Sequence, residues 1–320
     1  MAAPAHPGQE PQSAPSVLMV QPASFGFNQQ TAASNAFQRS GNSKRTREAQ
    51  KSALSEFDGV ATALQRAGIE VLVVPDTPQP EKPDAIFPNN WVSFHFDGTV
   101  ALYPMLAPNR RWERRDDVLE HVVRTGHFHV ARTVDLTHRE AEGKYLEGTG
   151  SVVLDRVHRV AYASLSPRTD LDVLGEFAQL LDYELVTFET HDAAGRPVYH
   201  TNVVMAIGTG FAAACGAAML PPHRAAVLKK LRAAGRKVVD LSLEQMQKFA
   251  GNILELATAG GPVIVLSATA LGALKPAQRR SLESYGELLT VTIPTIERIG
   301  GGGVRCMLAE VHLPKRRLMS

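Results

Sequence analysis

The chain has 320 residues, of which 44% are hydrophobic and 21% charged, as is ordinary for a globular protein with a large core. Its 34 basic and 32 acidic residues leave a formal net charge of +2, which argues against a general nucleic-acid binder. Two cysteines, Cys215 and Cys306, are too few for a disulfide-rich secreted scaffold or a multi-cysteine zinc site. The sequence shows no signal-peptide pattern and no apolar stretch of roughly 20 residues, so we expect a cytoplasmic protein that does not enter a membrane.

The chain begins with a segment rich in Pro, Ala and Gln, and we expect residues 1–15 to form a disordered tail. A single domain over residues 16–320 is expected to follow. Short apolar runs typical of strands then recur along it, starting at Val17, Val71, Ser151, Asn202 and Pro262.

Helix-like stretches lie between these runs. Residues 45–67 carry apolar side chains at helical spacing, and Gly68 follows as a stop signal. Residues 222–234 show the same spacing, and residues 242–250 form a third predicted helix with Ser242 as its N-cap.

Alternating strands and helices predict an α/β protein. The near-regular spacing of similar units indicates repeats closing around an axis, although an ordinary doubly wound sheet would give much the same pattern. No phosphate-binding glycine motif joins a strand to a helix, so no nucleotide cofactor is indicated. We expect neither a metal nor an organic cofactor.

Cys306 follows four consecutive glycines, Gly300 to Gly303, at the start of a predicted strand. The glycines let the backbone bend sharply and approach a ligand closely. Arg305 adds a positive charge that would favour a thiolate, although a buried inert cysteine would fit the same context. Cys215 has no charged neighbour in sequence and is interpreted as structural.

Three further polar residues stand at the edge of small-residue loops. His200 precedes a predicted strand and is followed by Thr201 and Asn202, Glu147 opens the segment LEGTGS, and Asp84 opens DAIFPNNW. A carboxylate or imidazole on a loop beside a buried strand is typical of an active-site rim.

These segments resemble the guanidine-modifying superfamily, which includes arginine and agmatine deiminases, dimethylarginine hydrolases and amidinotransferases. The resemblance covers roughly residues 17–314. Within the superfamily the chain is most similar to bacterial citrulline hydrolases, through FPNNWVSFH, YLEGTGS, YHTNVVMAIG and VRCMLAEVHLP. The resemblance implies a five-bladed α/β-propeller of ββαβ repeats, the pentein fold, with the active site in a central channel.

The same resemblance implies a role for each site residue. Cys306 would be the nucleophile, His200 its general acid/base, and Glu147 the carboxylate that orients the histidine. Asp84 would bind the substrate α-amino group. Arg168 and Arg111 would bind the α-carboxylate, with Arg110 as the alternative to Arg111.

Two asparagines distinguish this chain from many deiminases, which carry aspartates where it has Asn90 and Asn202. An ionised carboxylate can only accept hydrogen bonds and suits a cationic guanidinium, whereas an amide can donate to the oxygen of a neutral ureido group. Asn90 carries more of this inference, because dimethylarginine hydrolases also lack the second aspartate. Both residues are expected to bind substrate.

We therefore predict an enzyme that hydrolyses the ureido group of citrulline to ornithine, carbon dioxide and ammonia through a covalent Cys306 intermediate. Its partner would be a small-molecule substrate, and a homo-oligomer is compatible with the sequence. Three alternatives remain open: a dimethylarginine hydrolase or arginine deiminase, a protein that only binds an arginine-like ligand, and a zinc amidohydrolase using the H-x-H spacing at residues 127–129.

Overall fold

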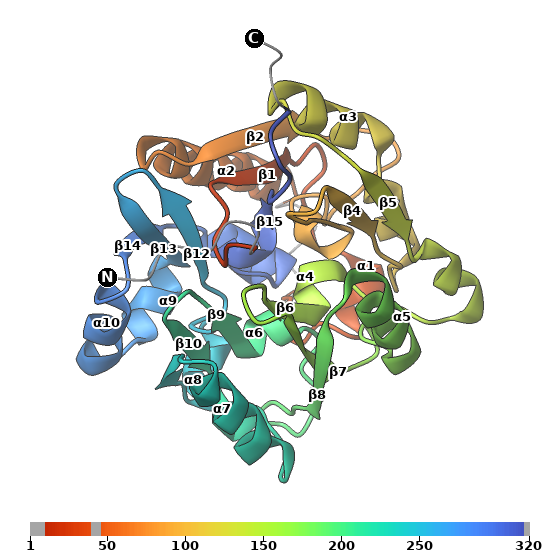
Figure 1. The fold of residues 1–320 in the computed structure, drawn as a ribbon. Helices are drawn as coiled ribbons and strands as arrows, with labels where there is room; N and C mark the ends of the chain where they lie inside the picture. The colour runs from red at the N-terminus through yellow and green to blue at the C-terminus, as the bar shows by residue number, and fades with distance from the viewer. Residues whose placement is uncertain (1–9, 40–45, 317–320) are drawn as a thin grey trace.

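The structure is a computed structural model that describes residues 10–39 and 46–316. Over these residues the strands form five sheets of three strands each. In each sheet one strand pairs antiparallel with a central strand, and a third strand, reached through a helix, pairs parallel with it. The sheets surround a common centre and the long helices lie outside (Figure 1). The chain is thus a five-bladed α/β-propeller of ββαβ units, as the resemblance implies.

Four blades are built from consecutive strands. Their strands are β3 (Val92–Phe94), β4 (Thr99–Leu102) and β5 (Arg132–Asp135), then β6 (Val152–Asp155), β7 (Val160–Leu165) and β8 (Glu184–Glu189), then β9 (Met205–Ile207), β10 (Phe211–Ala214) and β11 (Lys237–Asp240), and finally β12 (Leu254–Thr258), β13 (Gly261–Ser267) and β14 (Glu287–Val291).

The remaining blade joins the two ends of the chain. Its strands are β1 (Ser16–Gln21), β2 (Glu70–Pro75) and β15 (Ala309–Glu310). β15 pairs antiparallel with β1, so that Leu18 lies opposite Ala309. This pairing closes the ring and leaves no gap between the first and last units of the propeller.

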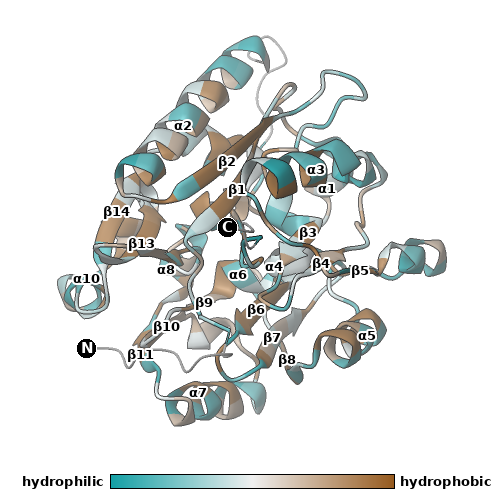
Figure 2. Ribbon diagram, turned by 45° about the horizontal axis from the view of Figure 1, so that its top comes forward, coloured by the Kyte–Doolittle hydropathy of each residue, from teal (hydrophilic) through white to brown (hydrophobic). Residues whose placement is uncertain are grey.

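Each blade is covered on the outside by a helix that connects its central and outer strands. These helices are α2 (Thr46–Arg66), α3 (Asp116–Thr125), α5 (Leu171–Leu181), α7 (His223–Ala233) and α10 (Pro276–Glu283). Figure 2 shows hydrophobic strands inside and hydrophilic surfaces on α2, α3 and α10. None of the helices in the described ranges is both long and apolar enough to cross a membrane.

The predicted helices are confirmed within the described residues, except that the third one ends at Gln247 instead of residue 250. Position 45, the predicted start of the first helix, lies outside the described residues. α2 ends shortly before Gly68, which has a φ of 88°, a backbone conformation that favours glycine. Ser242 caps α8 (Leu243–Gln247) in a capping box with Gln245.

Short helical turns precede the inner strands and position the site. They are η2 (Pro88–Asn90), α4 (Gly148–Ser151), α6 (Thr201–Val204) and η7 (Val304–Met307), ahead of β3, β6, β9 and β15. In the blade of β12 the turn is made by residues 249–252. The strand predicted from Asn202 therefore begins only at Met205, and Cys306 lies on a turn rather than on a strand.

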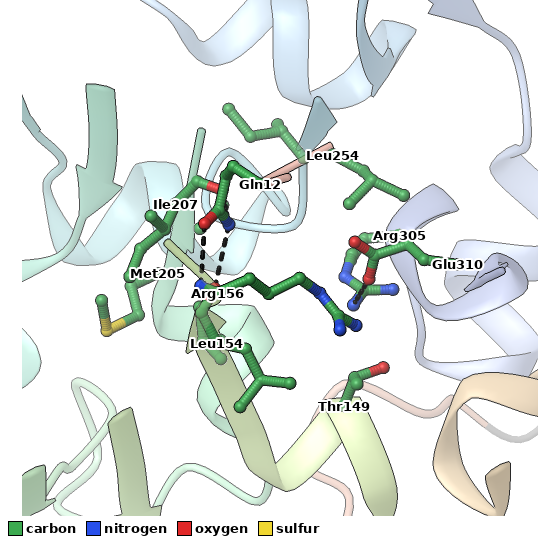
Figure 3. A pocket seen from close by; sticks show the side chains of 12 residues that line it. Gln12, Thr149, Leu154, Arg156, Met205, Ile207, Leu254, Arg305 and Glu310 are labelled. Carbon is green, nitrogen blue, oxygen red and sulfur yellow. Dashed lines mark hydrogen bonds and ion pairs between the residues drawn. The ribbon is translucent and has the colours of Figure 1, made fainter. Parts of the chain in front are cut away.

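The prediction of a disordered tail over residues 1–15 is wrong for residues 10–15, which pack into the propeller; residues 1–9 lie outside the described residues. Gln12 donates to the carbonyl groups of Leu154 and Ile207 at 2.9 and 3.2 Å and so bridges two blades (Figure 3). Glu10 forms ion pairs of 2.6 Å with both Arg156 and Arg159. The polar composition of this segment predicts disorder. The side chains of Gln12 and Glu10 nevertheless bind buried partners that are distant in the sequence.

Candidate active site

A small, narrow cavity lies where the helical turns meet. Its lining combines polar side chains with the glycine run: Asn35, Asp84, Phe87, Asn90, Arg110, Arg168, Tyr199, His200, Gly300, Gly301, Gly302 and Cys306. Across the described ranges, no group of three His, Cys, Asp or Glu side chains is arranged to hold a metal ion. The cavity instead offers a thiol, an imidazole, amides and ionised groups.

The structure brings seven of the eight predicted residues together. Five line the cavity, namely Cys306, His200, Asp84, Asn90 and Arg168. Two stand behind these, Glu147 against His200 and Asn202 against Cys306. Arg111 lies elsewhere.

His200 is buried and its Nε2 lies 2.9 Å from Glu147. Burial alone would raise the pKa of Glu147, but Arg168, His200 and Arg110 together hold that pKa well below its usual range. Burial lowers the pKa of His200 to about 4 even though Glu147 raises it. The ring is therefore neutral at neutral pH, with Nε2–H donating to the carboxylate and Nδ1 left as a proton acceptor. A Cβ at Gly150 would lie 2.8 Å from Nδ1, so glycine is required beside the ring.

Cys306 is buried, and its Sγ lies 3.3 Å from Asn252 Nδ2 and 3.6 Å from Asn202 Nδ2. Burial raises the pKa of the thiol, and Asn252, Arg305 and Asn202 lower it by less. The guanidinium of Arg305 is engaged elsewhere, because it forms an ion pair of 2.6 Å with Glu310. The predicted support of a thiolate by Arg305 is therefore weaker than expected, and the resting site holds a neutral thiol.

Asn90 has a defined amide orientation. Its Oδ1 accepts a hydrogen bond of 2.9 Å from Arg110, and its Nδ2 donates to Asn89 Oδ1 at 3.1 Å. Arg110 is held in turn by two hydrogen bonds to Glu113. Burial raises the pKa of Glu113 to about 7 despite its partner Arg110. The oxygen of Asn90 is thus turned towards a cation, and its NH₂ group remains as the donor within the cavity.

Arg111, predicted to bind a carboxylate, lies outside the cavity. Its guanidinium donates to the carbonyl group of Met105 and pairs with Glu140 at 3.3 Å. The neighbouring Arg110 lines the cavity instead. The two residues sit on η3 (Pro108–Glu113), where successive side chains point in different directions.

A short segment around α1 (Gln29–Ala32) is tied to the cavity through Asp84 and Arg168. Asn28 and Thr31 both donate to Asp84 Oδ2, at 2.8 and 3.3 Å. Arg168 donates to Ser34 Oγ at 2.8 Å and to the carbonyl group of Thr31 at 3.2 Å. Within the part of the chain that the structure describes, the buried Oδ1 of Asp84 has no hydrogen-bond partner. This oxygen is an acceptor available to a ligand.

Sequence reasoning missed Asn252, Tyr199 and Phe87. Asn252 contacts the sulfur, Phe87 lines the cavity, and the Tyr199 hydroxyl donates to the carbonyl group of Gly301 at 2.6 Å. One signal could have revealed Asn252: it is a polar residue in a small-residue loop just before a strand, the same setting as His200 and Glu147.

A family model described as N,N dimethylarginine dimethylhydrolase, eukaryotic, matches residues 21–313. No curated protein matches the sequence. Among solved structures, the N-terminal domain of ArgZ, an arginine dihydrolase from the ornithine-ammonia cycle in cyanobacteria, superposes with a TM-score of 0.71 at 17% identity, covering 94% of this chain and 99% of that one.

Two further solved structures are similar. AgrE, solved with L-arginine, gives a TM-score of 0.72 at 19% identity and covers 94% of this chain, which spans only 41% of AgrE. A dimethylarginine dimethylaminohydrolase, solved as an adduct with S-methyl-L-thiocitrulline, gives 0.62 at 16% identity and covers 92% of this chain and 98% of that one. At these identities the superpositions establish a shared fold.

Proposed function

The chain belongs to the N,N-dimethylarginine dimethylhydrolase family of the guanidine-modifying superfamily, and on that premise we propose that it is a cysteine hydrolase acting on the ureido group of citrulline. Its products would be ornithine, carbon dioxide and ammonia. Cys306 is the nucleophile in this proposal, and His200 is the acid/base.

The orientation of Asn90 carries the choice of a ureido substrate. Because Arg110 occupies its Oδ1, the amide presents Nδ2 to the cavity as a donor. A ureido oxygen can accept that hydrogen bond, whereas the N–H groups of a guanidinium cannot. Nδ2 already donates one hydrogen to Asn89, so a ureido oxygen would accept its second hydrogen. A hydrogen bond of this kind contributes about 0.5–1.5 kcal/mol, so this geometry favours the ureido group.

The charges around the cavity support the same substrate class. Arg110 and Arg168 contribute two positive charges, and Asp84 and Glu147 contribute carboxylates that are already paired with them. Glu147, the carboxylate that contacts His200, is therefore already neutralised by two arginines, whereas Asp84 keeps one oxygen without a partner among the described residues. The free Oδ1 of Asp84 suits the α-ammonium of an amino acid, and Arg168 suits its carboxylate.

The first chemical step is attack by sulfur on the ureido carbon. Neutral His200 accepts the thiol proton at Nδ1 as the S–C bond forms, while Glu147 stabilises the resulting imidazolium. Negative charge develops on the ureido oxygen, where Asn90 Nδ2 donates. A preformed thiolate is unnecessary, which agrees with the raised pKa of Cys306.

The second step releases the product nitrogen. The imidazolium returns its proton to the departing nitrogen, and the C–N bond breaks to leave a thiocarbamate on Cys306. His200 then takes a proton from one water molecule, whose oxygen attacks the same carbon. The C–S bond breaks, the thiol is restored, and once the second C–N bond has also broken, citrulline and one water give ornithine, ammonia and carbon dioxide.

Dimethylarginine hydrolysis is the second candidate, because the matching family model carries that activity in its description. It would use the same cysteine and histidine but release citrulline as a product rather than consume it. Arginine hydrolysis stands beside it, since ArgZ is an arginine dihydrolase. The three substrates differ in the group that faces Asn90.

A product assay separates these candidates. Purified protein is incubated in parallel with citrulline, arginine and asymmetric dimethylarginine, and ammonia, ornithine and citrulline are quantified. We expect ornithine from citrulline at a kcat/KM at least tenfold above that for the other two substrates. Citrulline accumulating from dimethylarginine, with citrulline itself unchanged, would replace the proposed function with the second candidate.

A further inference from the structure

The sulfur of Cys306 has an amide donor close to it. Asn252 Nδ2 lies 3.3 Å from Sγ, nearer than either side-chain atom of Asn202, whose Nδ2 and Oδ1 lie 3.6 and 3.8 Å away. Sulfur hydrogen bonds are long, and 3.3 Å is a close approach for a nitrogen donor. Asn252 is itself 1% exposed, so water does not compete for this contact.

The amide of Asn252 is fixed in the donating orientation. Its Oδ1 accepts a hydrogen bond of 3.1 Å from the backbone N–H of Arg305, and its Nδ2 also donates to the backbone carbonyl of Asn202 at 3.0 Å. A flipped amide would place oxygen against that carbonyl and NH₂ against that N–H, and both hydrogen bonds would be lost. The group that faces the sulfur is therefore N–H.

The glycine run and Arg305 hold this arrangement. A Cβ at Gly303 would lie 2.5 Å from Asn252 Oδ1, so a larger residue would displace the amide. The Arg305 side chain lies beside Glu310 (Figure 3), with which it forms an ion pair of 2.6 Å, and it donates to the carbonyl group of Leu308 at 2.8 Å. That anchor fixes the backbone N–H that orients Asn252.

We propose that Asn252 stabilises the thiolate of Cys306, and that Gly303 and Arg305 act as positioning residues for it. As the thiol gives its proton to His200, negative charge develops on the buried sulfur before the S–C bond is complete. A hydrogen bond from a neutral donor to that charge is stronger than one to the neutral thiol. The proposal rests on the proposed function in taking Cys306 as the nucleophile, but the contact needs no substrate.

Alkylation of Cys306 by iodoacetamide tests this directly, because the thiolate is the reacting species. In a Cys215→Ser background only Cys306 can react. Second-order rate constants are measured between about pH 6 and pH 9, where the rate follows the thiolate fraction. Peptide mass spectrometry identifies the labelled residue.

Asn252→Asp keeps an acceptor for the N–H of Arg305 and replaces the donor facing sulfur with a carboxylate. We expect its alkylation rate at neutral pH to fall at least tenfold, equivalent to about 1.4 kcal/mol, with the whole profile displaced to higher pH. Asn252→Ala removes the donor without adding charge and should shift the profile in the same direction by a smaller amount. Gly303→Ala should also slow alkylation, since it moves the amide away from its place.

An alkylation profile of Asn252→Ala that coincides with the parent, at an unchanged thermal midpoint, would overturn the proposal. If Asn252→Asp does not fold, Asn252→Ala and Gly303→Ala decide the question by the same profile. The proposed function fails independently: a shifted alkylation profile together with no turnover of citrulline would keep the role of Asn252 and remove the substrate. A purely structural role would lower the thermal midpoint without displacing the pH profile.

Discussion

Replacing Asn90 with aspartate is the perturbation that bears most directly on substrate choice. In the parent, Asn90 accepts from Arg110 at 2.9 Å and donates to Asn89 at 3.1 Å. Asn90→Asp would keep the contact with Arg110 and strengthen it into an ion pair. It would also place a carboxylate oxygen against Asn89 Oδ1 and against the substrate oxygen, so both donated hydrogen bonds would become repulsive contacts.

The expected magnitude follows from the lost donor. A hydrogen bond to a charged group contributes about 1.5–3 kcal/mol, and the ureido oxygen becomes an oxyanion in the transition state. With about 1.4 kcal/mol for each factor of ten, kcat/KM for citrulline should fall roughly 10- to 150-fold. Because the new ion pair with Arg110 compensates within the fold, the thermal midpoint of Asn90→Asp should stay close to that of the parent.

The assay is ornithine release from citrulline, run beside the same measurement with arginine. Asn90→Ala serves as the matched variant, since it removes the donor without adding a charge and should lose citrulline turnover while gaining nothing towards arginine. Asn90→Asp should raise the ratio of arginine to citrulline turnover. An unchanged kcat/KM for citrulline in folded Asn90→Asp would refute the reasoning from donors and acceptors.

Three further outcomes are expected. Cys306→Ser should abolish turnover at an unchanged thermal midpoint, whereas Cys215→Ser should retain it; activity in the first variant, measured as ornithine release, would remove the nucleophile. Burial lowers the pKa of His200 to about 4. We therefore expect kcat/KM to stay level from about pH 5 to pH 8 and to fall only as the pH drops towards that pKa. A pH–rate profile with its acid limb near about 6.5, the ordinary pKa of histidine, would contradict a buried neutral ring. Burial would raise the pKa of Glu10, but Arg156, His95 and His312 together outweigh it and hold that pKa at about 2. The stabilisation by Glu10 is therefore complete above about pH 4.5 and is lost as the pH falls through 2. Glu10→Gln should therefore lower the free energy of unfolding, measured in urea, by about 3 kcal/mol at neutral pH and by less near about pH 3. An equal decrease at both pH values would show that the charge of Glu10 does not stabilise the folded protein.

Much of the fold was accessible from the sequence because the repeating unit is local. The strands starting at Val17, Val71 and Pro262 coincide with β1, β2 and β13, and the helix predicted over residues 45–67 matches α2 within the described residues. Periodicity alone could not decide between a propeller and a doubly wound sheet. That choice depends on pairings such as β15 with β1, which join residues almost three hundred positions apart.

In the site, too, the residues in distinctive sequence segments could be predicted, whereas those identified only by their position in the fold could not. His200 and Cys306 stand in distinctive segments, and the structure places both at one cavity. Arg110 and Arg111 are neighbours in a short helical turn, and the sequence does not show which of them faces the cavity. The sequence favoured Arg111, whereas the structure places Arg110 in the cavity lining. Asn252 was missed because a neutral amide does not by itself indicate a role in catalysis. Its distance of 3.3 Å to the sulfur, which only the structure gives, reveals that role.

The N-terminal segment was misjudged for a related reason. From composition, Gln12 and Glu10 look like solvated residues of a polar tail. Their partners Leu154 and Arg156 lie more than 140 positions away in the sequence, so local composition cannot reveal these contacts. Burial of a polar side chain is favourable only when it finds such partners. Composition alone therefore could not locate the boundary of the folded domain.

Trapping the covalent intermediate tests the central claim most directly. Protein mixed with citrulline is quenched in acid during turnover and digested, and the peptide containing Cys306 is weighed by mass spectrometry. We expect a mass increase on Cys306 equal to a carbamoyl group, or to a carbamoyl group still attached to ornithine, and the choice between them shows which nitrogen leaves first. Turnover of citrulline with Cys306 unmodified throughout, or with the adduct on another residue, would contradict the account.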